Sequence, residues 1–268
     1  MSVKSFLDPL PRVIAHRGDS ANFPENTLPA FISASKLNID VIETDVHLSK
    51  DKVIVVWHDP TLERNTNGSG TIEEHPLEEL KKLDAGYTFT KDGGKTFPFR
   101  GKGVQLCTLD EALKACPEER FNIDLKSKNP EIVDAFIKVI RENHAENRVC
   151  CASFHLSNLK KLRAKAPDIL TSITTLEVLP KVLFTKFYSN KRFARKIIFQ
   201  VPVEQWHIKI IREDFIKKMH KKGAVIMVWT INERQKMHEL FSLGVDSVMT
   251  DNPRELIDVT LKDGIITR

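Results

Sequence analysis

Short runs of valine, isoleucine and other apolar residues alternate with amphipathic helical patterns along most of the chain. This alternation is typical of βαβ units, which place strands side by side in a parallel sheet and cover the sheet with helices. The runs predict nine strands, at residues 13–16, 41–46, 53–58, 121–126, 149–154, 170–174, 197–202, 224–230 and 247–250. The sequence therefore predicts an α/β fold.

Two of these strands, 41–46 and 53–58, are joined by the short turn Ser49-Lys50-Asp51. A turn this short suits an antiparallel hairpin better than a helical crossover. If the hairpin counts as one position, eight positions remain, and eight strands with helices between them in about 250 residues predict a (β/α)8 TIM barrel. A doubly wound open sheet is the alternative, but no glycine-rich phosphate fingerprint follows the first strand.

Residues 61–105 interrupt the alternation with a segment rich in glycine, lysine and phenylalanine. We expect one barrel domain over residues 1–268, with this segment inserted in an early βα loop. Because βα loops gather at the mouth of a barrel, the insertion is expected to lie over the mouth, where lids form.

Composition limits the class of protein. A chain of 268 residues with 41% hydrophobic and 29% charged residues is typical of a globular protein. Its apolar stretches are far shorter than the ~20 residues of a membrane-spanning helix, and its first residues lack the pattern of a secretory signal, so we expect a cytoplasmic location. The four cysteines include no Cys-x-x-Cys pair, which predicts free thiols rather than a disulfide framework or a structural zinc site.

The polar and aromatic residues that stand out lie at the carboxyl ends of the predicted strands. Parallel barrels carry their active sites at this end. The residues are His16 and Arg17 on the first strand, Glu43 and Asp45 on the second, His58 on the third, Asp124 and Lys126 on the fourth, and Trp229 near the end of the chain.

Three carboxylates in this set suggest a metal site. Glu43 and Asp45 are two residues apart, so their side chains leave the same face of one strand about 7 Å apart, and Asp124 adds a third carboxylate. Carboxylates without cysteine or paired histidine ligands favour a hard ion, Mg²⁺ or Ca²⁺, over Zn²⁺. The alternative is a structural salt-bridge layer in which these acids pair with Arg17 and Lys126.

Two histidines and two cations complete the set. His16 and His58 each end a strand, so they are expected to face each other across the mouth. Imidazoles exchange protons near neutral pH, which suits a pair to general acid and base roles. Arg17 and Lys126 beside a divalent cation suit a phosphate group, so the residues predict metal-assisted cleavage of a phosphoester.

Seven short motifs follow one another between residues 13 and 256. They are His16-Arg17-Gly18, Pro24-Glu25-Asn26-Thr27, Glu43-Thr44-Asp45-Val46, His58-Asp59-Pro60, Ile123-Asp124-Leu125-Lys126, Val228-Trp229-Thr230-Ile231-Asn232 and Val248-Met249-Thr250-Asp251-Asn252-Pro253. In their order and spacing, these motifs resemble those of the glycerophosphodiester phosphodiesterase family.

The resemblance implies a (β/α)8 barrel that hydrolyses glycerophosphodiesters to sn-glycerol 3-phosphate and an alcohol with one Mg²⁺ or Ca²⁺. It also implies roles for individual residues. These are His16 and His58 as the acid and base pair; Glu43, Asp45 and Asp124 as metal ligands; Arg17 and Lys126 as phosphate ligands; Glu25 and Asn26 as residues that orient these groups or contact the glycerol; and Trp229 as an apolar wall for the glycerol carbons.

One departure keeps a second function open. The family usually has glutamate where this chain has Asp124. The related sphingomyelinase D and lysophospholipase D enzymes have aspartate followed two residues later by lysine, as here, but they lack the Pro24-Glu25-Asn26-Thr27 element. Hydrolysis of lysophospholipids is therefore the alternative activity, and a non-catalytic barrel that binds phosphodiesters is the alternative from another class.

The segment 181–199 carries much of the positive charge. It contains six basic and five aromatic residues and no acidic residue. The basic residues are Lys181, Lys186, Lys191, Arg192, Arg195 and Lys196, and the aromatic residues are Phe184, Phe187, Tyr188, Phe193 and Phe199. The segment is expected near the mouth, and it predicts either contact with anionic lipid or a lysophospholipid tail, or a barrel helix with a solvated basic face. No recognised module supports nucleic-acid binding.

Overall fold

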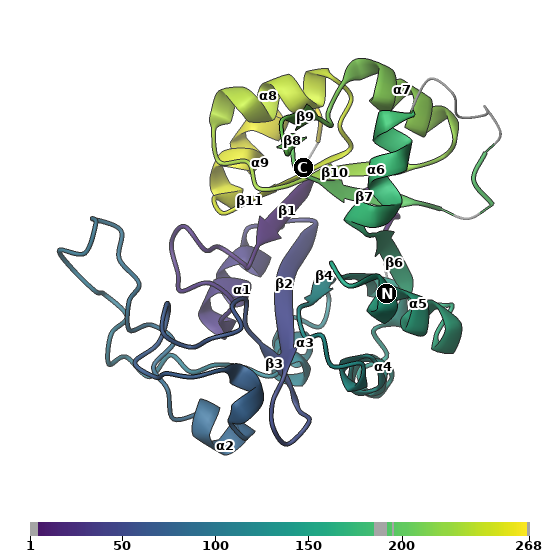
Figure 1. The fold of residues 1–268 in the computed structure, drawn as a ribbon. Helices are drawn as coiled ribbons and strands as arrows, with labels where there is room; N and C mark the ends of the chain where they lie inside the picture. Colours follow the sequence, from purple (N-terminus) through teal and green to yellow (C-terminus); the bar gives the residue numbers. More distant parts are fainter. Residues whose placement is uncertain (1–4, 185–191, 195, 267–268) are drawn as a thin grey trace.

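Eight parallel strands close into a barrel at the centre of the molecule (Figure 1). The structure is a computed structural model that describes residues 5–184, 192–194 and 196–266. The strands pair in the order β1-β2-β4-β5-β6-β7-β10-β11, and β11 pairs again with β1, so the barrel has no open edge. They are β1 Val13–His16, β2 Val41–Leu48, β4 Arg120–Leu125, β5 Val149–Ala152, β6 Leu170–Ile173, β7 Ile198–Val201, β10 Val225–Val228 and β11 Ser247–Thr250. The predicted barrel is confirmed.

The predicted hairpin is also present. Strand β3, Ile54–Val56, runs antiparallel to β2, with Val56 opposite Val46 and Ile54 opposite Leu48. A second, unpredicted hairpin of β8, Glu204–Gln205, and β9, Ile208–Lys209, follows β7. Its two-residue strands are too short to give a periodic pattern in the sequence.

Several strands end earlier than the sequence predicts. The run 149–154 ends as a strand at Ala152, and the run 224–230 ends at Val228. The residues that follow, Phe154, Trp229 and Thr230, line a pocket at the carboxyl end of the barrel instead of extending the strands.

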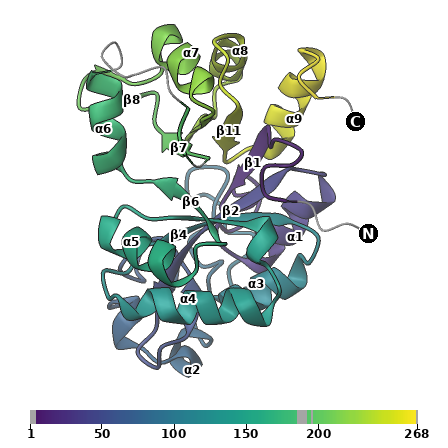
Figure 2. The ribbon, with the colours of Figure 1, turned by 90° about the vertical axis from the view of Figure 1, so that its right-hand side faces the viewer.

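Helices surround the barrel. Figure 2 shows α3, α4 and α5 on one side of the strands and α7, α8 and α9 on the other. The helices are α1 Leu28–Lys36, α3 Leu109–Ala115, α4 Glu131–Glu142, α5 Leu156–Lys165, α6 Thr175–Leu183, α7 Glu213–Lys221, α8 Arg234–Ser242 and α9 Pro253–Lys262, with a short 3₁₀ turn η2 at Glu146–Arg148. Helix α3 begins at a capping box, in which the Thr108 hydroxyl accepts from the Glu111 amide and the Glu111 carboxylate accepts from the Thr108 amide.

Successive residues of each strand pack on opposite sides of the barrel wall. Val13 and Ala15 belong to the large core between strands and helices, whereas Ile14 belongs to a smaller cluster inside the barrel. The buried members of this inner cluster are Phe6, Ile14, Val41, Cys150, Ile198, Val225, Met227 and Met249. Adjacent Cys150 and Cys151 fall in the two different clusters, and all four cysteines are buried and free, as predicted.

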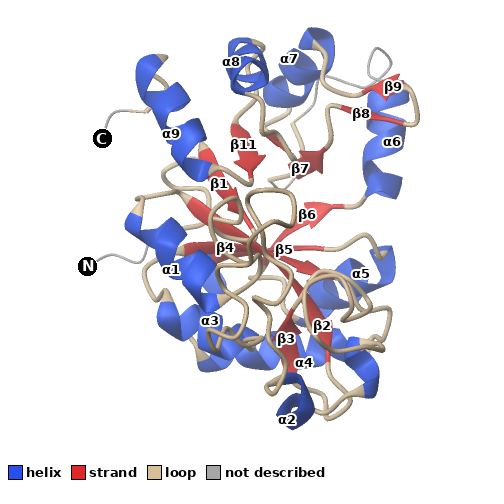
Figure 3. Ribbon diagram, turned by 90° about the vertical axis from the view of Figure 1, so that its left-hand side faces the viewer, coloured by secondary structure: helices blue, strands red, loops and turns tan. Residues whose placement is uncertain are grey.

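The insertion has a small core of its own. Residues 61–105 contain the 3₁₀ turn η1, Ile72–Glu74, and the short helix α2, Leu77–Leu80, and they pack around Trp57 and Leu62. Figure 1 places this segment on one side of the barrel, and Figure 3, seen from that side, shows its loops in front of the strands. Among the described residues that line the central pocket, none comes from the insertion.

The segment 181–199 lies partly outside the described residues, which exclude Lys186, Phe187, Tyr188, Lys191 and Arg195. The rest corrects one expectation. Residues 192–194 and 196–197 precede the amino end of β7, and the Phe193 amide donates to Lys222 O (3.0 Å), so these residues lie at the end of the barrel opposite the mouth. This follows from the topology, since connections from helix to strand lie opposite those from strand to helix. Phe199 is buried against Phe215 and cannot face a lipid.

None of the helices in the described part of the chain combines the length and apolarity that a membrane crossing requires.

Candidate active site

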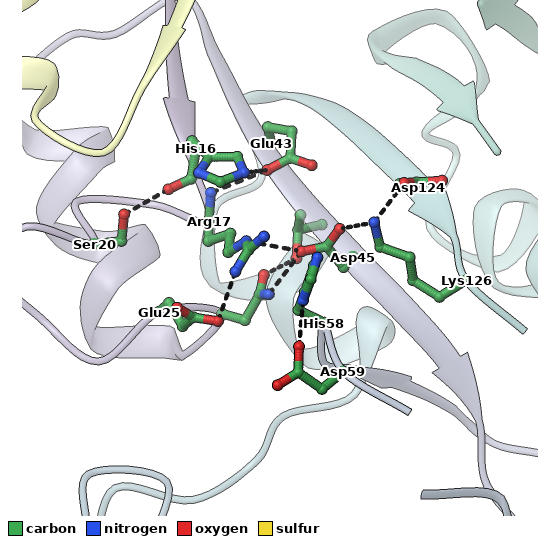
Figure 4. Close-up of polar contacts among 12 residues, drawn as sticks. His16, Arg17, Ser20, Glu25, Glu43, Asp45, His58, Asp59, Asp124 and Lys126 are labelled. Carbon is green, nitrogen blue, oxygen red and sulfur yellow. Dashed lines mark hydrogen bonds and ion pairs between the residues drawn. The ribbon is translucent and has the colours of Figure 1, made fainter. Parts of the chain in front are cut away.

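The two-residue period of the strands brings polar side chains to the open end of the barrel. On β1, His16 follows two residues after Ile14, which lies inside the barrel, and on β2, Glu43 and Asp45 follow Val41 in the same way. They line a pocket, and Figure 4 shows them converging with the side chains of neighbouring strands. The predicted residues that line it are His16, Arg17, Glu43, Asp45, His58, Asp124, Lys126 and Trp229.

His16 is held between two carboxylates. Its Nδ1 lies 2.6 Å from Asp251 Oδ1, and its Nε2 lies 3.9 Å from Glu43 Oε2. Asp251 is fixed in turn by hydrogen bonds from Asn232 Nδ2 (2.6 Å) and Ser20 Oγ (3.2 Å). Burial alone would lower the pKa of His16, but the two carboxylates outweigh burial and raise it. Because Nδ1 of the His16 ring contacts Asp251, the nitrogen that faces Glu43 is Nε2.

His58 has a different environment. Its Nδ1 lies 2.5 Å from Asp59 Oδ1, and the Asp59 carboxylate also accepts hydrogen bonds from Arg64. Burial lowers the pKa of His58, and the negative charge of Asp45 offsets this only in part. The pKa values of the two imidazoles are thus shifted in opposite directions.

Glu43 and Asp45 are both buried and differ in their partners. Asp45 Oδ1 lies 2.9 Å from Lys126 Nζ, and Oδ2 accepts from Asn26 Nδ2 (3.0 Å). Arg17 Nε lies 3.2 Å from Asp45 Oδ2 without the alignment of a hydrogen bond. Burial would raise both pKa values, but these cations lower that of Asp45 to about 2. For Glu43, burial and the nearby Asp45 charge prevail and raise the pKa to about 7.

Lys126 bridges two carboxylates. Its Nζ lies 2.9 Å from Asp45 Oδ1 and 2.7 Å from Asp124 Oδ2, and these charges raise the pKa of Lys126 in spite of its burial. The other oxygen, Asp124 Oδ1, is buried and has no hydrogen-bond partner. Burial is the largest influence on Asp124 and raises its pKa.

Glu43, Asp45 and Asp124 supply the oxygen donors that Mg²⁺ and Ca²⁺ prefer. A divalent cation would satisfy the unpartnered Asp124 Oδ1 and relieve the repulsion between Glu43 and Asp45, so the donor chemistry fits a hard ion. As placed, however, no three acidic, histidine or cysteine side chains within the described ranges are gathered closely enough to hold an ion. The contacts of Lys126 correspond to the salt-bridge alternative.

The turn after β1 places Arg17 at the pocket. Arg17 and Gly18 both adopt positive φ, 56° and 85°, and a Cβ on Gly18 would lie 2.7 Å from the Ala30 carbonyl carbon. Only glycine fits this close approach to α1. The turn directs the Arg17 amide to Glu43 Oε2 (3.1 Å) and its guanidinium to Glu25 Oε1 (2.9 Å).

Glu25 and Asn26 lie behind the pocket lining. Glu25 binds Arg17, and its pKa is lowered because Arg64 and Arg17 outweigh the effect of burial. Asn26 Oδ1 accepts from Thr44 Oγ1 (2.7 Å) while its Nδ2 donates to Asp45. Both side chains therefore hold pocket residues in place.

The pocket has a charged half and a neutral half. Charged side chains come from β1, β2, β4 and the residues after β3, whereas the described lining contributed by β5, β6, β7 and β10 carries no ionisable side chain. Trp229 lies in the neutral half with its ring centroid 6.3 Å from that of Phe154, in an edge-to-face pair. The charged half suits a phosphate group, and the neutral half suits an uncharged carbon skeleton.

Sequence reasoning gave no role to three residues around the histidines, Asp59, Asp251 and Arg64. Asp59 and Asp251 lie at strand ends, and a closed barrel puts the last strand beside the first, so Asp251 could have been placed next to His16. Arg64 gave no such signal, because the fold of the insertion does not follow from any periodic pattern.

Comparison with known proteins agrees with this geometry. Residues 16–255 match the model of the glycerophosphoryl diester phosphodiesterase family. A glycerophosphodiester phosphodiesterase from Caldanaerobacter subterraneus subsp. tengcongensis is 34% identical over 261 residues, which cover 94% of this chain and 98% of that protein. The mouse lysophospholipase D GDPD1 is 26% identical, with 93% of this chain and 86% of that protein covered.

Solved structures show the same barrel. A phosphodiesterase from Oleispira antarctica, in complex with the product sn-glycerol 3-phosphate, is 25% identical and has a TM-score of 0.77, with 96% of this chain and 99% of that chain covered. A glycerophosphodiester phosphodiesterase from Agrobacterium tumefaciens is also 25% identical, with a TM-score of 0.74 and coverage of 94% and 100%.

Proposed function

The chain belongs to the glycerophosphoryl diester phosphodiesterase family, and from this premise we propose how its pocket cleaves a glycerophosphodiester into sn-glycerol 3-phosphate and an alcohol. The observation that carries the proposal is the convergence of two imidazoles, three carboxylates and two cations on one pocket whose other half is neutral. Membership of a family of phosphoric diester hydrolases favours this activity over a non-catalytic barrel.

Arg17 and Lys126 are the proposed phosphate ligands. Both line the pocket, where Glu25 binds Arg17 and where Asp45 and Asp124 bind Lys126. A planar guanidinium can bind two phosphate oxygens at once, and an ammonium adds a point charge. Together they would stabilise the negative charge that builds on the phosphoryl oxygens in the transition state.

His16 and His58 are the proposed acid and base pair. One imidazole takes a proton from the attacking water as its oxygen bonds to phosphorus, and the other gives a proton to the alcohol oxygen as its bond to phosphorus breaks. Each ring has its Nδ1 bound to a carboxylate, Asp251 or Asp59, which leaves Nε2 for the substrate.

We propose one divalent metal ion, Mg²⁺ or Ca²⁺, held by Glu43, Asp45 and Asp124. When bound, the ion supplies a positive charge that polarises the phosphoryl group. The proposal requires Lys126 to release Asp124 to the ion and turn toward the phosphate, because its ammonium now bridges two of the three carboxylates. The buried Asp124 Oδ1 without a partner supports this ligand set.

The test is release of sn-glycerol 3-phosphate from glycerophosphocholine by the whole chain. We expect no release in EDTA and restored release with Mg²⁺ or Ca²⁺. Unchanged turnover in EDTA would contradict the metal, and failure on every deacylated glycerophosphodiester would contradict the substrate class.

A lysophospholipid is the second candidate substrate. Two apolar side chains near the neutral half are exposed: Phe154, which lines the pocket, is 56% exposed, and Leu176, which follows the pocket residue Thr175 in α6, is 67% exposed. The name of the mouse relative, lysophospholipase D, accords with this possibility. Lysophosphatidylcholine belongs in the same assay, and Leu176→Ser should slow its turnover while leaving that of glycerophosphocholine unchanged. Equal turnover of lysophosphatidylcholine by both proteins would contradict the role of Leu176.

Contact of the segment 181–199 with anionic lipid is a separate proposal, because Arg192 and Lys196 precede the amino end of β7, opposite the mouth. Arg192 and Lys196 are exposed among the described residues and support it. Sedimentation with vesicles that contain an anionic phospholipid should recover less of an Arg192→Ala, Lys196→Ala variant than of the wild type. Equal recovery of the two proteins would end the proposal.

A further inference from the structure

Arg64 lies in the insertion and outside the pocket lining, yet its guanidinium binds two carboxylates, Glu25 and Asp59, that contact pocket residues. Nη2 lies 2.6 Å from Glu25 Oε1 and Nη1 lies 3.1 Å from Glu25 Oε2. Nε donates to Asp59 Oδ2, and Nη2 also lies 3.2 Å from Asp59 Oδ1. One planar group thus engages all four oxygens of two carboxylates, which a lysine ammonium cannot do.

Each of these carboxylates reaches on to a pocket residue. Glu25 Oε1 also accepts from Arg17 Nη1 at 2.9 Å. Asp59 Oδ1 lies 2.5 Å from His58 Nδ1. Arg64 is therefore the centre of a continuous chain of contacts that runs from Arg17, through both carboxylates, to His58. Figure 4 shows the outer members, with Glu25 beside Arg17 and Asp59 beside His58.

The backbone at Arg64 and just before it is anchored. Trp57 Nε1 donates to Thr61 O (2.9 Å), which ties the loop to the residues after β3. Leu62 is buried in the small core of the insertion, and Thr88 Oγ1 donates to Arg64 O (2.8 Å). The backbone that carries Arg64 is thus fixed in place, although the Arg64 side chain is 43% exposed.

We infer that Arg64 is a positioning residue: it fixes the distance between the Arg17 guanidinium and the His58 imidazole through Glu25 and Asp59. This inference rests on the proposed function, since it assigns Arg64 to the same reaction. It also gives the insertion a task in catalysis, because the insertion supplies the group that holds two separate parts of the mouth together.

The expected effect is on rate. A displacement of about 1 Å at a reacting group can cost on the order of 100-fold. Arg64→Ala should therefore lower kcat for glycerophosphocholine by about 10- to 100-fold, with a smaller change in KM. Added methylguanidinium should restore several-fold of this loss by binding the two carboxylates in place of the side chain. Arg64→Lys should remain impaired, because an ammonium cannot span four oxygens.

The matched control is Arg100→Ala. Arg100 belongs to the same insertion, but its guanidinium stacks on Phe97 and Tyr87 and donates to Tyr87 O (2.7 Å), away from the pocket. We expect its kcat to stay within twofold of the wild type, with no effect of methylguanidinium. If Arg64→Ala keeps kcat within twofold, or loses activity only together with its melting temperature and without rescue, the inference is wrong.

Crystal structures of the wild type and Arg64→Ala provide a readout that needs no substrate. We expect the His58 and Arg17 side chains to be displaced, or to adopt two conformers, in the variant only. Unmoved side chains in the variant would overturn the inference even if the protein proves inactive on glycerophosphodiesters. Inactivity of the wild type with displaced side chains in the variant would instead count against the proposed function alone.

Discussion

Individual side chains reach the pocket through the two-residue period of the strands. On β1, Ile14 fills the barrel and His16 lies at its open end, and on β2 the same period carries Val41, Glu43 and Asp45. This period is visible in the sequence, so His16, Glu43 and Asp45 could be placed at the open end of the barrel without a structure. The ion pairs among the pocket residues could not be predicted in this way. The bridge that Lys126 makes between Asp45 and Asp124 depends on which strands are neighbours.

The first prediction concerns His16. His16→Ala should lower kcat by about 100- to 10,000-fold, the usual contribution of a general acid or base. The fold should persist, because the ring lies at the open end of the barrel and not in its core. Steady-state kinetics and thermal unfolding measure the two effects. The control is His207→Ala, an exposed histidine of the β8–β9 turn. Activity of His16→Ala within tenfold of the wild type would exclude His16 as acid or base.

At the scale of elements, the strands and the β2–β3 hairpin were predictable because apolar periodicity and turn length are local properties. The β8–β9 hairpin and the internal packing of the insertion were not, since they depend on contacts between segments without a repeating pattern. Residues 192–194 and 196–197 were expected at the mouth and lie at the opposite end of the barrel, where the topology of a parallel barrel would have placed them.

The turn between β1 and α1 supports a second prediction. Gly18→Ala should destabilise the protein by about 2 kcal/mol or more, because the added methyl meets the Ala30 backbone and the residue must keep a positive φ. Gly93→Ala is the control, since Gly93 also has a positive φ but faces open space, and it should cost about 1–2 kcal/mol. Urea unfolding compares the two. Equal losses would show that the close approach to α1 is unimportant.

A third prediction concerns pH and the joint between α7 and β11. His220 Nε2 lies 2.8 Å from Asp246 Oδ2. This hydrogen bond and the Asp246 charge raise the pKa of His220, against the effects of burial and Arg12. A raised pKa in the folded state stabilises the protein below the unfolded pKa of about 6.5, and this contribution is lost as pH rises through the folded pKa.

His220→Gln should therefore lower the melting temperature more at pH 6 than at pH 9. Thermal unfolding at the two pH values measures the difference, with His207→Gln, a substitution of an exposed side chain, as the control. A loss that is equal at both pH values would mean that the charge of His220 contributes nothing to stability.

At the scale of the whole molecule, closure of the barrel makes the site. His16 and Asp251 are 235 residues apart in the sequence and touch because β11 pairs with β1. The charged half of the pocket comes mainly from the first half of the chain, while β5, β6, β7 and β10 supply the neutral half. The barrel fold and the eight predicted residues that line the pocket could be identified from the sequence. The metal ion and the cytoplasmic location remain predictions.

The metal gives a fourth prediction with a readout other than activity. An ion that binds the folded state alone stabilises it by about 2.7 kcal/mol at 100 times its Kd. Millimolar Mg²⁺ or Ca²⁺ should therefore raise the melting temperature of the EDTA-treated wild type by several degrees. Asp124→Asn should lose most of this shift, and Asp134→Asn, a surface acid paired with Lys161, should keep it. No shift in the wild type would contradict the ligand set.

The central claim is that this pocket breaks the bond between phosphorus and the alcohol oxygen of a glycerophosphodiester. Phosphorus-31 NMR of glycerophosphocholine, incubated with the chain and a divalent metal ion, follows that bond directly. We expect the diester resonance to be replaced by that of sn-glycerol 3-phosphate, and to persist with His16→Ala. Phosphocholine as the product, or an unchanged diester with the wild type, would contradict the account.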